Sequence, residues 1–397
     1  APLAAGSGHA DCLVVLREAG VDLGVARNNG DTPAHLAAEN GHVDCLVLLR
    51  EAGMDLGVAR NDGRTPAHHA AINGHADCLV VMREAGVDLG VARNDGDTPA
   101  HHAAINGHAD CLVVLREAGV DLGVANKKGS TPAHFAALRG NADCLVLLLE
   151  AGEDLDVVNE YGKTPAHYAA ENGYADILEL LRDAGIDLDA VDIDGKTPAH
   201  CAAYFGEADC LVVLRDAGVK LGVADNMDLT PAHYAARKGY FQCLVVLREA
   251  GVKLGVADEE GFTPAHEAAI HGKFECLVVL RNAGVELNVA NNMDWTPAHY
   301  VARNGHLQCL ELLRDAGVEL NIANNDGITP AHLAAENGNA NCIVVLRDAG
   351  MDLNVVNHEG KTPSDFAAKM GHFDCLAILS DANDEPMDEE DWENEDD

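Results

Sequence analysis

Cysteine is the residue type in this 397-residue sequence with the widest choice of chemistry, because a thiolate can bind a metal, attack a substrate or form a disulfide. Eleven of the twelve cysteines recur at multiples of 33 residues, and Cys201 alone lies off this series. Each therefore falls on a helix of its own, about 8–10 Å from the next. A disulfide needs Cα atoms within about 7 Å, so we predict buried free thiols and no metal site. The series is Cys12, Cys45, Cys78, Cys111, Cys144, Cys210, Cys243, Cys276, Cys309, Cys342 and Cys375.

The free thiols also indicate where the protein resides. Unpaired cysteines are typical of a reducing compartment, so the sequence predicts an intracellular protein, cytoplasmic or nuclear. Ile177 takes the cysteine position in the remaining unit, which favours a small apolar side chain in a core. Cys201 is predicted to be the most accessible thiol, because it alone lies outside the series.

Histidine is the second residue type with catalytic or metal-binding potential. Ten of the twenty histidines occur in the motif Thr-Pro-Ala-His, from His35 to His332. A catalytic or metal site needs different residue types that converge, whereas this repetition supplies parallel rows of one type. We expect each histidine to hydrogen-bond its own turn and to tie one unit to the next. The sequence therefore predicts no enzyme, no catalytic residue, no metal and no cofactor.

A fixed period organises the whole chain. The dipeptide Thr-Pro recurs every 33 residues, and a partial copy of the same unit precedes the first occurrence. A period of this length indicates stacked supersecondary units, so we predict twelve units. The threonines of this dipeptide are Thr32, Thr65, Thr98, Thr131, Thr164, Thr197, Thr230, Thr263, Thr296, Thr329 and Thr362.

The unit of residues 29–61 shows the local signals. Gly30 suits a turn, Thr32 can cap a helix, and Pro33 fits the first helical position, where an N–H would be unused. Gly41 ends that helix, and a second one with 3.6-residue apolar periodicity follows. Because a short helix pair cannot bury its apolar stripe alone, neighbouring units must stack. The sequence predicts an all-α solenoid with turns projecting from one edge.

The repeated pattern Gly-x-Thr-Pro-Ala-His-x-Ala-Ala-x-x-Gly, followed by Cys-Leu-x-x-Leu-Arg-x-Ala-Gly-x-x-Leu, resembles the ankyrin repeat over about residues 1–383. The resemblance implies a curved stack of helix-turn-helix units with projecting β-turns, a binding surface on the turns and first helices, and no catalysis. The first unit is truncated, and Asp365 replaces the histidine of the last, which suits a polar cap. Residues 384–397 hold ten acidic residues and no basic one, so we predict a disordered acidic tail.

The charge balance excludes two classes of partner. The chain has 27 Lys and Arg against 65 Asp and Glu, for a formal net charge of −38. Nucleic acids and anionic membrane surfaces both require a basic footprint, and no apolar run is long enough to span a membrane.

A row of arginines in the second helices is almost always followed by Glu or Asp, so we expect local ion pairs rather than an anion-binding stripe. We predict a monomer.

The position directly before Thr in each turn is the predicted contact position, because it should project from the edge of the stack. It is polar in seven of the eleven turns and large and apolar in four consecutive ones, which we call the ladder: Leu229, Phe262, Trp295 and Ile328. Exposed apolar surface of this extent marks interaction sites. The alternative is that these side chains fold onto neighbouring turns and hold the stack together. Eight further residues are predicted to contribute to the site: Tyr161, Tyr204, Phe205, Tyr234, Ile270, His271, Met293 and Tyr300.

Three functions are compatible with these observations. The first is a non-catalytic scaffold that binds another protein on its concave, turn-bearing surface at about residues 160–330. The second is an acidic chaperone or decoy for proteins with a basic surface. The third is the targeting arm of a larger enzyme.

Overall fold

The computed structural model describes residues 1–381, and within this range it contains 24 helices and no strand. The helices form twelve pairs, one in each 33-residue unit, which confirms the predicted architecture. We number the units 1 to 12 along the chain and call the turn before each first helix by the number of its unit. The predicted acidic tail, residues 384–397, lies outside the described residues.

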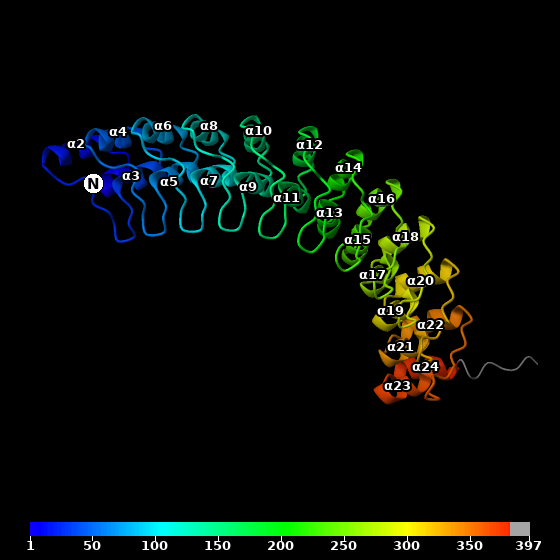
Figure 1. Ribbon diagram of the computed structural model, residues 1–397. Coiled ribbons are helices and arrows are strands. Elements are labelled where there is room, and N and C mark those ends of the chain that lie inside the picture. Colours follow the sequence, from blue (N-terminus) through cyan, green and yellow to red (C-terminus); the bar gives the residue numbers. More distant parts are fainter. Residues whose placement is uncertain (382–397) are drawn as a thin grey trace, which may run out of the picture. The chain divides into compact units, whose positions relative to one another are not determined.

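The helices group into two compact bodies. The first body comprises residues 1–202 and 212–219. Figure 1 shows its odd-numbered helices side by side in one row next to the turns, with the even-numbered helices in a second row. The helices of units 1 to 6 are α1 (Pro2–Gly6), α2 (Ala10–Glu18), α3 (Pro33–Glu39), α4 (Val43–Glu51), α5 (Pro66–Asn73), α6 (Ala76–Glu84), α7 (Pro99–Asn106), α8 (Ala109–Glu117), α9 (Pro132–Arg139), α10 (Ala142–Glu150), α11 (Pro165–Glu171) and α12 (Ala175–Asp183).

Of the described residues, the second body comprises 203–211 and 220–381. Consecutive odd-numbered helices pack together, and so do consecutive even-numbered ones. The residues of unit 7, α13 (Pro198–Phe205) and α14 (Ala208–Asp216), are divided between the two bodies. The remaining helices are α15 (Pro231–Lys238), α16 (Phe241–Glu249), α17 (Pro264–Ile270), α18 (Phe274–Asn282), α19 (Pro297–Asn304), α20 (Leu307–Asp315), α21 (Pro330–Glu336), α22 (Ala340–Asp348), α23 (Pro363–Met370) and α24 (Phe373–Asp381).

The Thr-Pro-Ala-His motif begins each first helix and links it to the next unit. In α5 the backbone N–H of Thr65 donates to Nδ1 of His68 at 3.1 Å. Because a backbone N–H can only donate, Nδ1 is an acceptor and the ring proton lies on Nε2. Nε2 then donates to the carbonyl of Asp97 in the following turn, at 3.2 Å. The predicted structural role of these histidines is therefore confirmed.

The link recurs with closely similar geometry along both bodies. Each Nε2 lies 2.9–3.2 Å from a carbonyl oxygen 29 residues further on. The histidines that make it are His35, His68, His101, His134, His167, His233, His266, His299 and His332.

The residue before Thr does not project from the stack as predicted. At Leu229, for example, the N–H donates to Oδ1 of Asp225 at 3.0 Å, and the carbonyl accepts the N–H of Asp225 at 2.9 Å. Both backbone groups are held inside the turn, and the side chain of Leu229 is buried. The prediction that this position is exposed is wrong in all but the last turn, where Lys361 is exposed. The side chains are buried at Asp31, Asp97, Ser130 and Leu229 and half-buried at Arg64, Lys163, Lys196, Phe262, Trp295 and Ile328.

Ten cysteines of the series are buried, as predicted, and two thiols differ from the prediction. Cys12 is exposed, because within the described residues its helix α2 packs against α4 on one side only. Cys201 is buried beside the Lys163–Glu171 ion pair, and desolvation raises its pKa to about 12. The prediction that Cys201 is the most accessible thiol is therefore wrong.

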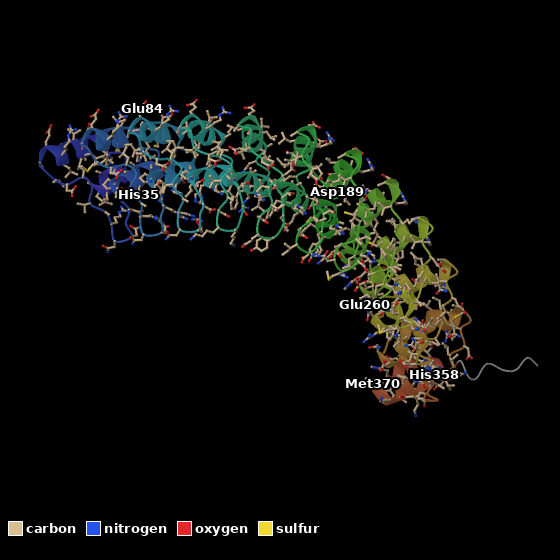
Figure 2. The ribbon with its side chains drawn as sticks, viewed as in Figure 1. His35, Glu84, Asp189, Glu260, His358 and Met370 are labelled. Atoms are coloured by element: carbon tan, nitrogen blue, oxygen red, sulfur yellow. The ribbon has the colours of Figure 1, made fainter. Side chains whose placement is uncertain are left out.

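The arginine row forms two kinds of ion pair. Where Asp follows the arginine, the two residues pair directly, as Arg182 does with Asp183 at 2.9 Å. In three of the units where Glu follows, the arginine reaches the glutamate of the next unit instead, as Arg50 does with Glu84 at 2.9 Å. Glu84 lies on the row of second helices, away from the turns (Figure 2). The predicted ion pairing is confirmed at these positions, and such exposed pairs contribute at most about 1 kcal/mol each.

Candidate functional site

The structure separates the twelve predicted contact residues by exposure. Leu229, Tyr234 and Tyr300 are buried, with 3–8% of their surface accessible, so they cannot form an open apolar surface. Phe262, Trp295, Ile328 and Ile270 are half-buried. The exposed members are Tyr161, Tyr204, Phe205, His271 and Met293.

The aromatic side chains of the ladder pack within the stack. The Trp295 ring lies with its centroid 5.7 Å from that of His299 and 5.1 Å from that of Tyr300. The Phe262 ring is 5.6 Å from His266 and 5.8 Å from Tyr300, which belongs to the following unit. These contacts support the alternative stated above, that the ladder holds neighbouring units together. The rings of Phe262 and Trp295 nevertheless remain half-buried rather than fully enclosed.

Turns 8 and 10 differ from the other turns in their backbone. Asp228 and Asp294 adopt φ of 58° and 57°, and they are the only non-glycine residues with positive φ in the described chain. The equivalent position is otherwise glycine, with φ between 70° and 93°. The preceding residues, Met227 and Met293, are exposed by 55% and 54%. Sequence analysis did not place Met227 in the site, although its match to Met293 two units later was a usable signal.

The glycine of an ordinary turn allows the next turn to approach closely. A Cβ on Gly96 would lie 2.7 Å from the backbone nitrogen of Lys127, and one on Gly261 would lie 2.9 Å from that of Asn292. Each of these nitrogens donates to the preceding turn, as Lys127 does to the carbonyl of Asp95 at 3.0 Å. A side chain at the glycine position therefore forces the two turns apart.

Asp228 and Asp294 have that side chain, and the turns after them are correspondingly separated. Within the described residues, neither the Glu259 nor the Asn325 N–H donates to the preceding turn. The Asn61 N–H of turn 3 does not donate to turn 2 either, within the described residues, although turn 2 contains Gly30. Glycine therefore permits the hydrogen bond between turns without enforcing it. The aspartates of turns 8 and 10 exclude it.

A pocket opens at each of the two separated turns. Between turns 8 and 9 it measures about 330 Å³, and between turns 10 and 11 about 420 Å³. Both combine an exposed methionine, an apolar floor from the ladder and an arginine from the first helix. The first pocket is lined by Asn226, Met227, Leu229, Arg237, Asp258, Glu259 and Glu260. The second is lined by Asn292, Met293, Trp295, Tyr300, Arg303, Asn324, Asn325 and Asp326.

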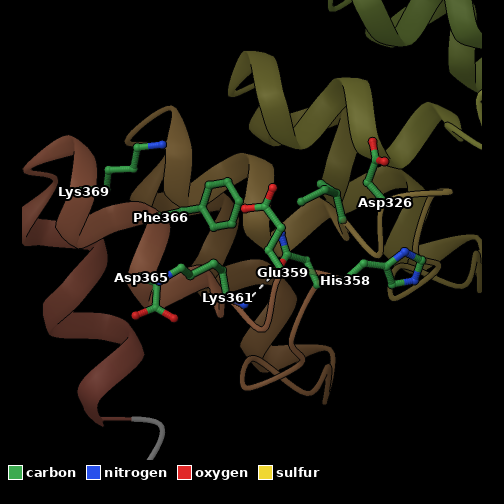
Figure 3. Close-up of a pocket in the computed structure, with 9 residues that line it drawn as sticks. Asp326, His358, Glu359, Lys361, Asp365, Phe366 and Lys369 are labelled. Carbon is green, nitrogen blue, oxygen red and sulfur yellow. Dashed lines mark hydrogen bonds between the residues drawn. The ribbon is translucent and has the colours of Figure 1, made fainter.

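A third pocket of about 640 Å³ lies between units 11 and 12 (Figure 3). Lys361 and Lys369 line it together with Asp326, Glu359 and Asp365, so it has no single sign of charge. Asp365 replaces the usual histidine and accepts the Thr362 N–H at 2.9 Å. A carboxylate cannot donate onward as Nε2 does, so this helix is capped without a link to a further unit.

Asp294→Gly is expected to close the second pocket and to stabilise the protein. A non-glycine residue in the left-handed region costs about 1 kcal/mol, and glycine would let the Asn325 N–H donate to the Met293 carbonyl. Urea unfolding should show the gain, and hydrogen exchange should show new protection at the Asn325 amide. Asp294→Asn keeps the Cβ and is the matched control. Unchanged exchange at Asn325 in the glycine variant would contradict this account of the pocket.

Two searches of the described residues bear on other kinds of site. No helix within residues 1–381 is long and apolar enough to cross a membrane. In the same range, no group of three or more His, Cys, Asp and Glu side chains is placed to hold a metal ion.

Comparison with known proteins gives one consistent result. A family model described as ankyrin repeats (3 copies) matches residues 3–93, 48–126, 79–157, 101–192, 185–258 and 299–390. A second, described as ankyrin repeats (many copies), matches residues 265–314. A search of curated proteins finds no match. With its 33-residue helix pairs and capped first helices, the chain belongs to the ankyrin-repeat family.

Proposed function

We propose that this chain is a non-catalytic scaffold that binds another protein on the turns and first helices of its second body, centred on turns 8 to 11. Ankyrin repeats are generally protein–protein interaction modules. The observation that carries the proposal is the pair of aspartates with positive φ, each next to an exposed methionine and an open pocket. Strained backbone of this kind persists where it serves function, and methionine adapts well to a partner surface.

The turns of the first body offer less to an apolar partner. The residue that corresponds to Met227 and Met293 is polar in turns 2 to 5, and Tyr161 is the first apolar one. Tyr204 and Phe205, which belong to unit 7 and are exposed by 38% and 43%, extend the apolar surface of the second body. The buried free thiols support an intracellular location, cytoplasmic or nuclear.

The double variant Met227→Glu/Met293→Glu tests this surface. Both side chains are more than half exposed, so the free energy of unfolding should change by no more than about 0.5 kcal/mol. Proteins cross-linked to the wild-type chain in cell extract should be lost from the variant. The matched control is Val158→Glu/Val191→Glu, at two positions of the first body with 52% and 54% exposure. The surface is wrongly placed if the double variant retains its partners or the control loses the same ones.

The charge of the chain favours a second candidate, an acidic chaperone or decoy for basic proteins. Its formal net charge is −38, and ten of its acidic residues lie in residues 384–397. Ionic strength separates the two functions. A complex held by net charge should weaken about 100-fold or more between 0.05 and 0.5 M salt. One anchored on the methionines and rings should weaken less than about 10-fold.

A further inference from the structure

Two arginines occupy the same position in units 8 and 10, and each lies over an aromatic ring, but only the first is paired with a carboxylate. Arg237 lies over the ring of Tyr234, with its guanidinium carbon 5.8 Å from the ring centroid. Its Nε donates to Oε2 of Glu267 and its Nη2 to Oε1, both at 2.8 Å. Glu267 is buried in the first helix of the next unit. A carboxylate of the chain itself thus accepts two hydrogen bonds from the Arg237 guanidinium group.

Arg303 also lies over an aromatic ring, but over the turn residue Trp295 rather than a first-helix tyrosine, and it has no carboxylate. Its guanidinium carbon lies 5.5 Å from the centroid of the Trp295 ring. The residue that corresponds to Glu267, 30 positions after the arginine, is Leu333, which is buried and has no acceptor. Arg303 is exposed, and among the described residues it forms no ion pair. Its guanidinium group therefore lines the pocket between turns 10 and 11 without a carboxylate partner among the described residues.

The rest of this pocket restricts what can fill it. Met293 and Trp295 supply an apolar wall, and the side-chain amide of Asn325 supplies a further donor, whereas that of Asn292 already donates to the Glu259 carbonyl at 2.9 Å. Asp326 is the acidic residue of the lining, and Asp294 stands at the turn beside it. An occupant thus needs an anion opposite Arg303, an apolar group on the wall, and a basic or neutral group near the two aspartates. An acidic side chain within an otherwise basic or neutral peptide segment meets all three conditions.

We propose that Arg303 binds a Glu or Asp side chain of the partner protein, in the place that Glu267 occupies on Arg237. A large apolar side chain of the same segment packs on Met293 and Trp295. Arginine and carboxylate form two parallel hydrogen bonds, which makes the pair both strong and specific in geometry. The inference rests on the proposed function and names the chemistry that its surface recognises.

The first test uses two peptides and the full chain. One peptide is Lys-Gly-Leu-Glu-Leu-Gly-Lys, blocked at both ends, and the other has Gln in place of Glu. NMR of the ¹⁵N-arginine-labelled protein should show the Arg303 Nε–H resonance shifting with the Glu peptide, at an affinity at least 10-fold above that of the Gln peptide. Arg303→Gln should remove this difference, and because Arg303 is exposed the variant should remain folded. Equal binding of both peptides would overturn the proposal.

Leu333→Glu supplies the missing carboxylate from within the chain. It should shift the Arg303 Nε–H resonance without peptide and lower the affinity for the Glu peptide at least 10-fold. Leu333→Gln is the control of matched size and should retain binding. The reciprocal variant Glu267→Leu should release Arg237 and add a second site. If Leu333→Glu binds the Glu peptide as the wild type does, the proposed geometry is wrong.

Two further outcomes separate this inference from its alternatives. If Arg303→Gln and Leu333→Glu still capture the cellular partner that Met227→Glu/Met293→Glu loses, the proposed function stands and the carboxylate inference fails. The chain's own residues 384–397 carry the same chemistry. If replacing their ten acids by Asn and Gln shifts the Arg303 resonance without added peptide, that segment is the occupant, and the assignment to a partner is overturned.

Discussion

The protein is expected to lose most of its stability between pH 6.5 and pH 4. Protonation of Nδ1 in a linking histidine would place a proton against the Thr N–H that this nitrogen accepts, so the cap and the charged ring are incompatible. Burial lowers the pKa of these histidines below the usual value of 6.5. For five histidines the pKa falls to about 4: His68, His69, His102, His134 and His299.

The direction of the effect follows from proton uptake. Between pH 6.5 and 4 the unfolded chain binds protons at these histidines and the folded chain does not, so stability falls as the pH falls. A pKa lowered from 6.5 to about 4 corresponds to about 3 kcal/mol for each histidine. A few such groups together reach the scale of the whole free energy of unfolding of a domain, about 5–15 kcal/mol.

Urea unfolding followed by circular dichroism at several pH values between 7 and 4 would measure this loss. His134→Gln serves as the control, because an amide can accept the Thr131 N–H and donate onward without titrating. This variant should show a shallower dependence, by about 1.4 kcal/mol per pH unit below pH 6. A free energy of unfolding that stays constant from pH 7 to 4.5 would show that the histidines are not held neutral.

One cysteine of the twelve is expected to react with a thiol reagent in the folded protein. Cys12 is exposed, whereas burial raises the pKa of other thiols, to about 12 at Cys111 and Cys201 and to about 11 at Cys309. At pH 8 a thiol of pKa 12 is ionised to about one part in ten thousand. Labelling of the thiols whose pKa is about 11 or 12 should therefore be at least about 100-fold slower than that of Cys12, even before access to the reagent is considered.

Iodoacetamide labelling followed by mass spectrometry of peptides would assign the rates. All twelve cysteines should react in 6 M guanidinium, and Cys12→Ser should remove the fast phase from the folded protein. Rapid modification of Cys201 under native conditions would restore the sequence-based prediction and contradict the burial described above.

The fold could be predicted from the sequence because its determinants are local and repeated eleven times. Thr, Pro and His lie within four residues of one another, and the cap they form needs no distant partner. The exposure of the residue before Thr could not be predicted in this way. It depends on the turn's internal hydrogen bonds and on a histidine 29 residues earlier, so its side-chain direction emerges only when the units are stacked.

The candidate site could be predicted only in part for a similar reason. The sequence shows that Asp228 and Asp294 replace glycine, and it shows the large residues that follow them. It does not show that a Cβ at this position would meet the backbone of the next turn. The difference between Arg237 and Arg303 likewise depends on a contact across 30 residues, from Arg237 to Glu267.

The histidine link has a consequence for how such a chain can change. Each Nε2 donates to a main-chain carbonyl, which every amino acid possesses, so the side chain at that position can vary while the bond persists. The acceptor residues already include Arg64, Ser130 and Trp295. Any unit can therefore follow a unit that carries this histidine with the same bond at the junction. Gain or loss of a whole 33-residue unit, and exchange of residues that face a partner, can both proceed without a matching mutation in the neighbouring unit.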